Sequence, residues 1–129
     1  MAQAKSRILV IEDDDQTALF IQHVLERAGY EVSFATDGRK AAELIGHMPL
    51  PDLITLDIDL PYATGDELML KIKTTEGWER VPVVMVTRKP KTVDTTWAVK
   101  SGARAYLVKP FKPEQLIECV GKLVAKQAS

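Results

Sequence analysis

The sequence has little cysteine and no long hydrophobic run. One cysteine, Cys119, among 129 residues excludes an internal disulfide framework and is typical of a reducing compartment. No apolar stretch approaches the length of a membrane span, and no apolar segment follows the charged N-terminus as it would in a signal peptide. These absences predict a cytoplasmic protein that does not contact membranes.

An excess of charge of one sign is also lacking. The 17 Lys and Arg residues nearly balance the 18 Asp and Glu residues, which leaves a net charge of −1. Nucleic-acid-binding proteins usually carry a basic excess or stripe, so we expect no direct contact with nucleic acid. No Gly-x-Gly-x-x-Gly motif follows a strand and no phosphate loop ends in Gly-Lys-Ser/Thr, which argues against a nucleotide-binding domain.

Short apolar runs alternate with amphipathic segments along the whole chain. The runs expected to form strands are Arg7–Ile11, Glu31–Ala35, Asp52–Leu56, Val81–Val86 and Ala103–Val108. The segments expected to form helices are Gln16–Ala28, Gly38–His47, Asp66–Thr75, Thr92–Ser101 and a last helix that Pro113 opens. This alternation predicts an α/β protein with a parallel sheet covered by helices on both faces. One domain fills residues 1–129, with a core over about 7–125.

Reactive side chains stand where the predicted strands end. Glu12 and Asp13 follow the first strand, Asp57 the third, Thr87 the fourth and Lys109 the fifth. Parallel strands place these ends at one edge of the sheet, which is where open α/β sheets bind ligands. Carboxylates gathered there repel one another unless a cation joins them, and Mg²⁺ suits oxygen ligands. A carboxylate between Mg²⁺ and the lysine can attack phosphorus and form an aspartyl phosphate.

Four consecutive acids begin at Glu12, and we expect them to divide into two pairs. Glu12 and Asp13 directly follow a buried strand, so we assign them to the site. Asp14 and Asp15 precede a helical pattern, and a loop or a helix N-cap explains them without any further role.

In this order and spacing, the residues resemble the receiver (CheY-like) domain of two-component response regulators. The resemblance covers essentially the whole chain and rests on four blocks: Ile8–Asp14, Pro51–Pro61 followed by Gly65, Val81–Thr87 and Gly102–Phe111. It implies a flavodoxin-like, doubly wound sheet of five parallel strands in the order 2-1-3-4-5 with five helices. It also implies a phosphorelay protein rather than an enzyme with its own substrate.

The resemblance assigns a role to each reactive residue. Asp57 is the implied phosphoacceptor, and Lys109 pairs with the phosphoryl group. The implied Mg²⁺ ligands are Glu12, Asp13, Asp57 and the backbone carbonyl of Asp59. Thr87 and Tyr106 form the implied switch, in which Tyr106 turns inward when Thr87 moves toward the phosphoryl group. The bond between Lys109 and Pro110 is the implied cis peptide.

The resemblance also names partners. A histidine kinase or a phosphotransfer protein donates the phosphoryl group. A downstream protein target then binds the face made by the fourth helix, fifth strand and fifth helix, with Trp97 and Tyr106 as candidate contacts. The chain is expected to be a monomer or a phosphorylation-dependent dimer. No output domain is recognisable, so output requires a protein contact or a domain outside this sequence.

Two positions depart from the usual pattern. The residue two after the phosphoacceptor is acidic, Asp59, and we expect it to alter the lifetime of the phosphorylated state. The residue after Thr87 is usually small but is Arg88 here. A long cation at that place is expected to screen the phosphoryl group or to limit access, so that Arg88→Ala speeds phosphorylation by a small donor.

Two other readings stay open on sequence alone. Asp57-Ile58-Asp59 resembles the Asp-x-Asp motif of haloacid-dehalogenase-type phosphohydrolases, which use an aspartyl nucleophile and Mg²⁺. That motif belongs on the first strand of a larger domain, whereas here it follows the third. The second reading is a receiver-like module that signals without phosphorylation, which the complete set of reactive residues disfavours and Arg88 keeps open.

Overall fold

The computed structural model describes residues 5–58, 65–88 and 102–128. Its elements are β1 (Arg7–Ile11), α1 (Asp15–Arg27), β2 (Glu31–Ala35), α2 (Gly38–Leu44), β3 (Leu53–Asp57), α3 (Gly65–Thr74), β4 (Val83–Thr87), β5 (Ala105–Val108) and α5 (Pro113–Ala128). The five strands form one parallel sheet in the order β2-β1-β3-β4-β5. The predicted fold class and strand order are therefore confirmed. The expected helix Thr92–Ser101 lies outside the described residues.

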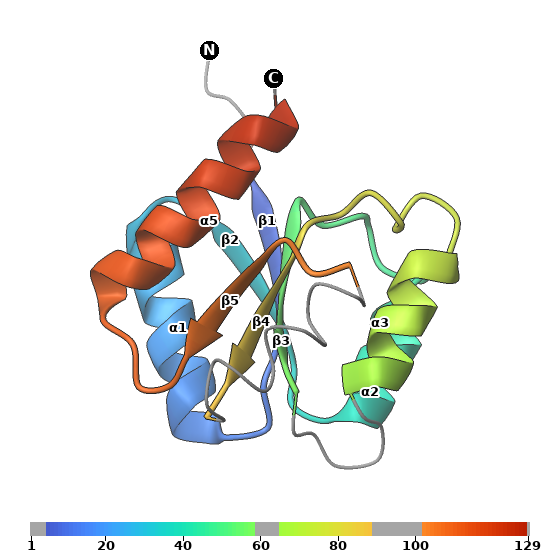
Figure 1. Ribbon diagram of the computed structural model, residues 1–129, viewed down its shortest axis with the longest axis horizontal. Coiled ribbons are helices and arrows are strands. Elements are labelled where there is room, and N and C mark those ends of the chain that lie inside the picture. Colours follow the sequence, from blue (N-terminus) through green and yellow to red (C-terminus); the bar gives the residue numbers. More distant parts are fainter. Residues whose placement is uncertain (1–4, 59–64, 89–101, 129) are drawn as a thin grey trace.

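Helices cover the sheet on both faces. Figure 1 shows α1 and α5 against one face, and α2 and α3 against the other. Each face has its own apolar cluster: Ile8, Val10 and Leu116 belong to the α1–α5 side, and Leu9, Ile11 and Met85 belong to the α2–α3 side. Successive residues of β1 therefore enter opposite clusters, as the period of a strand requires. The sheet is the shared wall of two cores.

The central strands are buried on both faces. Every residue of β3 and β4 is buried, whereas β2, at the edge of the sheet, alternates between exposed and partly buried positions before it ends at buried Ala35. A parallel strand covered on both sides reads as a continuous apolar run, which explains why the segments that become β3 and β4 are so uniformly hydrophobic. Asp57 and Thr87, the last residues of these two strands, therefore end strands that are buried along their whole length.

Local chemistry sets the start and end of α1. The Asp14 carboxylate caps the helix by accepting hydrogen bonds from the Thr17 amide at 2.9 Å and from the Thr17 hydroxyl at 2.5 Å. Gly29 follows the helix with φ +99°, a left-handed conformation that glycine adopts without strain. The cap predicted at Asp14 or Asp15 is thus Asp14, and α1 begins one residue earlier than expected.

Several element ends differ from the predictions. α2 ends at Leu44 rather than His47, because Gly46 turns the chain with φ +89°. β4 starts at Val83 rather than Val81, since Pro82 has no amide to join the ladder. β5 likewise begins only at Ala105. α5 continues to Ala128, past the end of the core that was expected near residue 125. No helix among the described residues is long and apolar enough to cross a bilayer.

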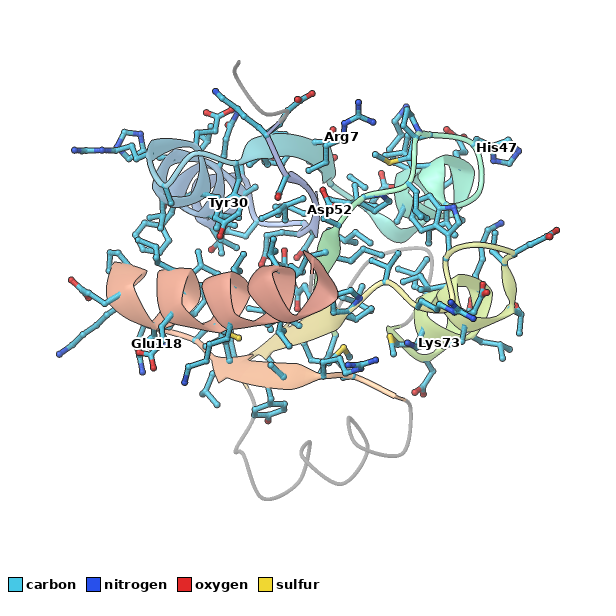
Figure 2. The ribbon with its side chains drawn as sticks, turned by 90° about the horizontal axis from the view of Figure 1, so that it is seen from above. Arg7, Tyr30, His47, Asp52, Lys73 and Glu118 are labelled. Atoms are coloured by element: carbon cyan, nitrogen blue, oxygen red, sulfur yellow. The ribbon has the colours of Figure 1, made fainter. Side chains whose placement is uncertain are left out.

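The amino ends of the strands form the edge opposite the reactive residues. The Arg7 amide donates to Asp52 Oδ2 at 2.7 Å, which ties the start of β1 to the approach of β3. Figure 2 views the molecule from this side, with Arg7 and Asp52 near its middle and His47 and Lys73 near the α2–α3 side. Trp78 lies in the turn between α3 and β4 and is buried in the α2–α3 core.

Candidate functional site

The carboxyl ends of β1 and β3 bring three acids together. One carboxylate oxygen from each of Glu12, Asp13 and Asp57 lies within 4.8 Å of the other two. Glu12 and Asp57 are buried, whereas Asp13 is exposed. The register pairs Ile11 with Leu56, so the residues that follow them emerge side by side. The structure therefore gathers the three acids that the sequence analysis assigned to one site.

Lys109 supplies the positive charge within this acidic group. Its ammonium lies 2.7 Å from Glu12 Oε1 and 3.5 Å from Asp57 Oδ2, and its side chain is only 10% exposed. The Asp14 amide donates to the other Glu12 oxygen, Oε2, at 3.2 Å. Oε1 is fully buried and makes no hydrogen bond of good geometry within the described chain, so its contact with Lys109 is an ion pair only. Glu12 is thus pinned between a backbone amide and the lysine.

Asp57 is a weakly stabilised carboxylate in this environment. Burial raises its pKa to about 8, Glu12 adds to the rise through its proximity and charge, and Lys109 opposes it. Without a further cation, the carboxyl group therefore holds its proton near neutral pH. A second positive charge at this edge would favour the ionised form, which is the form that acts as a nucleophile.

Thr87 and Tyr106 lie on the neighbouring strands β4 and β5. Thr87 is fully buried at the end of β4, and its carbonyl accepts from the Lys109 amide at 2.7 Å. Tyr106 pairs in register with Met85, two residues before Thr87, and is half-buried against the α2–α3 core. The peptide bond between Lys109 and Pro110 is cis, as expected. The structure therefore places the two predicted switch residues on adjacent strands, with Thr87 at the edge that carries the acids and Tyr106 further back along β5.

A cleft of about 650 Å³ opens above Asp57. It is lined by Asp13, Asp14, Asp15, Gln16, Asp57, Arg88 and Lys109. A neighbouring groove of about 560 Å³ shares Asp14, Gln16, Arg88 and Lys109 with it and is completed by Thr17, Phe20, Pro110 and Phe111. The rings of Phe20 and Phe111 lie 5.9 Å apart. This partly apolar extension was not predicted, because Phe20 follows the pattern of an ordinary helix residue. It meets Phe111 only because α1 packs beside the segment between β5 and α5.

The donor set fits a small, hard cation. Mg²⁺ takes oxygen ligands at about 2.0–2.1 Å and keeps several waters, so two of its ligands lie at most about 4.2 Å apart. A spread of up to 4.8 Å among the three carboxylates is close to that limit and suits a shell in which one of them binds through water. The buried, unsatisfied Oε1 of Glu12 is an oxygen that such a water would satisfy. The acidic cluster is therefore chemically able to hold a metal ion.

Two predicted residues lie outside the described part of the chain. These are Asp59, with its carbonyl ligand, and Trp97 on the expected partner face. Cys119 lies within α5 and is half-buried, and burial raises the pKa of its thiol. A thiol with a raised pKa reacts slowly, in line with the inert packing role that its position suggests.

Sequence comparisons identify a family along most of the chain. The model of the response regulator receiver domain matches residues 8–121. The DNA-binding response regulator MtrA of Mycolicibacterium smegmatis is 36% identical over 117 residues, which cover 91% of this chain and 50% of the relative. The uncharacterised transcriptional regulatory protein YrkP of Bacillus subtilis is 37% identical over 110 residues, 85% of this chain and 46% of the relative. The chain thus spans about half the length of the curated relatives it matches.

Solved structures agree with the sequence comparisons. A response regulator of Chloroflexus aurantiacus superposes with a TM-score of 0.88 at 31% identity, covering 95% of this chain and 99% of that one. The receiver domain of the Pseudomonas aeruginosa sensor histidine kinase PA1611, solved with magnesium in its active-site cleft, gives 0.86 at 28% identity with the same coverage. The chemotaxis regulator CheY4 of Vibrio cholerae also gives 0.86 at 28% identity, over 93% and 99% of the two chains.

The comparisons concern two of the expectations from the sequence, the phosphohydrolase alternative and the absence of contact with nucleic acid. They give the phosphohydrolase reading no support, because the family match and the strand order both belong to receiver domains. They do not fit directly with the expectation that nucleic acid plays no part, since the MtrA relatives are named for DNA binding.

Proposed function

The chain belongs to the response regulator receiver domain family, and from that premise we propose that its acidic cleft accepts a phosphoryl group on Asp57. The observation that carries the proposal is the position of Asp57 itself. It ends a fully buried strand, shares the cleft with two acids that fit Mg²⁺, and lies 3.5 Å from the Lys109 ammonium. No other described carboxylate combines a rigid strand end, a potential metal site and an adjacent cation.

The proposed transfer is a displacement at phosphorus. One Asp57 oxygen forms a bond to the phosphorus of a phosphohistidine while the bond between phosphorus and the imidazole nitrogen breaks. The electron pair leaves with the nitrogen, and the imidazole takes up a proton. Asp13, Asp57 and Glu12 would hold Mg²⁺ at this edge, and the ion would neutralise charge on the phosphoryl oxygens. Lys109 adds a second positive charge on the other side.

Lys109 has two functions in this proposal. In the metal-free protein its ammonium forms an ion pair with Glu12 and lies beside the Asp57 carboxyl group, so the two acids can lie together before any ligand arrives. After transfer, a phosphoryl oxygen on Asp57 competes with Glu12 for the same ammonium. The lysine is already placed on the strand end that faces Asp57, so this exchange requires rotation of a side chain rather than movement of the sheet.

The proposed output begins at Thr87. Its hydroxyl donates to a phosphoryl oxygen, and the displacement of Thr87 opens space that Tyr106 fills. Because Thr87 and Tyr106 lie on adjacent strands, phosphorylation of Asp57 changes the position of the Tyr106 side chain and thereby the surface formed by β5 and α5. A nearly complete reversal of two states needs about 5.5 kcal/mol of differential binding. We propose that a downstream protein reads this face, and that the residues of this chain make no direct contact with nucleic acid.

The partners follow from the family. Response regulators receive phosphoryl groups from histidine kinases, and we propose that a kinase or a phosphotransfer protein serves this cleft. We propose that the domain assists only its own phosphorylation and dephosphorylation and does not turn over other substrates. The longer MtrA and YrkP relatives are regulators, and a similar regulatory role for the protein that carries this domain is likewise a proposal.

Intact mass spectrometry after incubation with acetyl phosphate tests whether Asp57 accepts a phosphoryl group. We expect one added phosphoryl group when Mg²⁺ is present and none in excess EDTA. Asp57→Asn should remain unmodified. Asp15→Asn is the matched control, because Asp15 lines the same cleft but is exposed and belongs to the first turn of α1. Modification of Asp57→Asn at the parent rate would overturn the proposal.

A further inference from the structure

Arg88 lies at the junction of the two hollows described above. It directly follows Thr87, is exposed, and lines both the acidic cleft and the adjacent Phe20–Phe111 groove. Only three other residues, Asp14, Gln16 and Lys109, are common to both. A donor whose phosphoryl group enters the cleft while its carrier lies in the groove must therefore pass this guanidinium.

The mouth of the cleft needs a positive charge that is not already occupied. Asp13, Asp14 and Asp15 all line it, and phosphoryl donors are anions that these carboxylates repel. Lys109 is nearly buried and is already shared between Glu12 and Asp57. Arg88 forms no ion pair with any residue in the described parts of the chain. Among the described residues that line the cleft, Arg88 is thus the cation without an ion-pair partner.

Asp14 lines both hollows together with Arg88. Its carboxylate accepts hydrogen bonds from the amide and the hydroxyl of Thr17. Asp14 is committed to capping α1 through those bonds, so it does not need the guanidinium as a partner. No described residue therefore forms an ion pair with the guanidinium, and its planar fork suits two oxygens of one phosphoryl group.

We propose that Arg88 is a specificity-determining residue that recruits anionic phosphoryl donors to the cleft before Lys109 and the metal act on them. This inference rests on the proposed phosphorylation of Asp57. It is the opposite of the sequence-based expectation that Arg88 limits access, because an exposed side chain can move aside for a donor.

The test compares rates of adduct formation by acetyl phosphate at saturating Mg²⁺ in low salt. Arg88→Gln should react about 3- to 10-fold more slowly than the parent, because one steering charge is lost. Arg88→Lys should retain most of the rate. Near 1 M salt, where the screening length is only about 3 Å, parent and Arg88→Gln should converge. Phosphoramidate, which carries less negative charge, should show a smaller difference.

Arg80→Gln is the matched control. Arg80 is also exposed, but it precedes β4 and lies at the opposite edge of the sheet, so its replacement should leave the rate unchanged. Mg²⁺ affinity is measured for each variant so that a change in metal binding is not read as a change in recruitment. A rate for Arg88→Gln that equals or exceeds the parent rate in low salt overturns the inference. If the parent and Arg80→Gln also fail to form the adduct, the proposed function itself fails.

Discussion

The Lys109 ammonium lies closer to Glu12 than to Asp57, at 2.7 Å against 3.5 Å. In the metal-free protein, Lys109 is therefore held mainly by Glu12 and only weakly by Asp57, the proposed phosphoacceptor. Because Glu12 is buried, removing this one cation leaves its carboxylate without the ion pair that Lys109 provides.

Replacement of Lys109 should destabilise the metal-free domain. We expect Lys109→Ala to lower the free energy of unfolding in EDTA by roughly 1–3 kcal/mol, since Glu12 Oε1 loses its neighbouring charge. Lys122→Ala is the control, because Lys122 forms only an exposed helical pair with Glu118 and should change stability by less than about 0.5 kcal/mol. Urea denaturation measures both. Equal stability of Lys109→Ala and the parent would show that the buried acids need no counter-charge.

The stability of the metal-free domain should fall as pH rises from about 4 to about 8. The Asp57 carboxyl holds its proton to a pKa of about 8 in the folded state but releases it near 3.8 when exposed. Between these values the folded state binds more protons than the unfolded state, so raising the pH favours unfolding. Melting curves in EDTA across this range test the effect. Asp57→Asn should melt with a markedly weaker dependence on pH, and an identical dependence would exclude Asp57 as its source.

Loss of one acid should weaken metal binding selectively. We expect Asp13→Asn to reduce Mg²⁺ affinity about 10-fold, because the charge of the ligands sets the strength of such sites. Asp15→Asn makes the same chemical change two residues further along, where the carboxylate belongs to the first turn of α1. That control should change affinity less than about 3-fold. Isothermal titration of both variants decides the matter, and similar losses in the two would indicate general charge attraction rather than ligation.

Replacing Gly121 and Gly29 by alanine should change the stability of the fold in opposite directions. Gly121 lies within α5, and a Cβ there would meet Tyr30 Oη at an ordinary contact distance of 3.9 Å. Gly121→Ala should therefore stabilise the fold by about 0.5–1 kcal/mol. Gly29 has open space around it but φ +99°, so Gly29→Ala should destabilise by about 1 kcal/mol. Thermal melting compares them, and a shift of the same sign in both would contradict this account.

The sequence was most informative where a buried strand ends in a polar residue. The apolar runs before Glu12, Asp57 and Thr87 identify three strand ends. In a parallel sheet, these ends lie at the same edge, so the three residues are expected near one another. The cap at Asp14 was predictable for the same local reason, since it precedes a helical pattern. These predictions depend only on neighbouring residues and on one rule of sheet architecture.

Predictions failed where backbone geometry overrides hydrophobicity. Val81 is buried like a strand residue, yet Pro82 keeps it out of the ladder. The apolar pattern of α2 continues past Leu44, but the turn at Gly46 ends the helix. The Phe20–Phe111 wall and the place of Arg88 at the junction of two hollows depend on how α1 packs near the end of β5, and no local pattern encodes that contact.

The separation of the two edges of the sheet has a practical consequence for attaching the molecule to a surface. The turn between α2 and β3, which contains His47, lies at the edge viewed in Figure 2, on the far side of the sheet from the acidic cleft. His47 is exposed and has no part in the proposed chemistry. A His47→Cys variant coupled through its new thiol to a linker or to biotin would be immobilised with its cleft facing the solution. Donors and partners could then be passed over an unobstructed site.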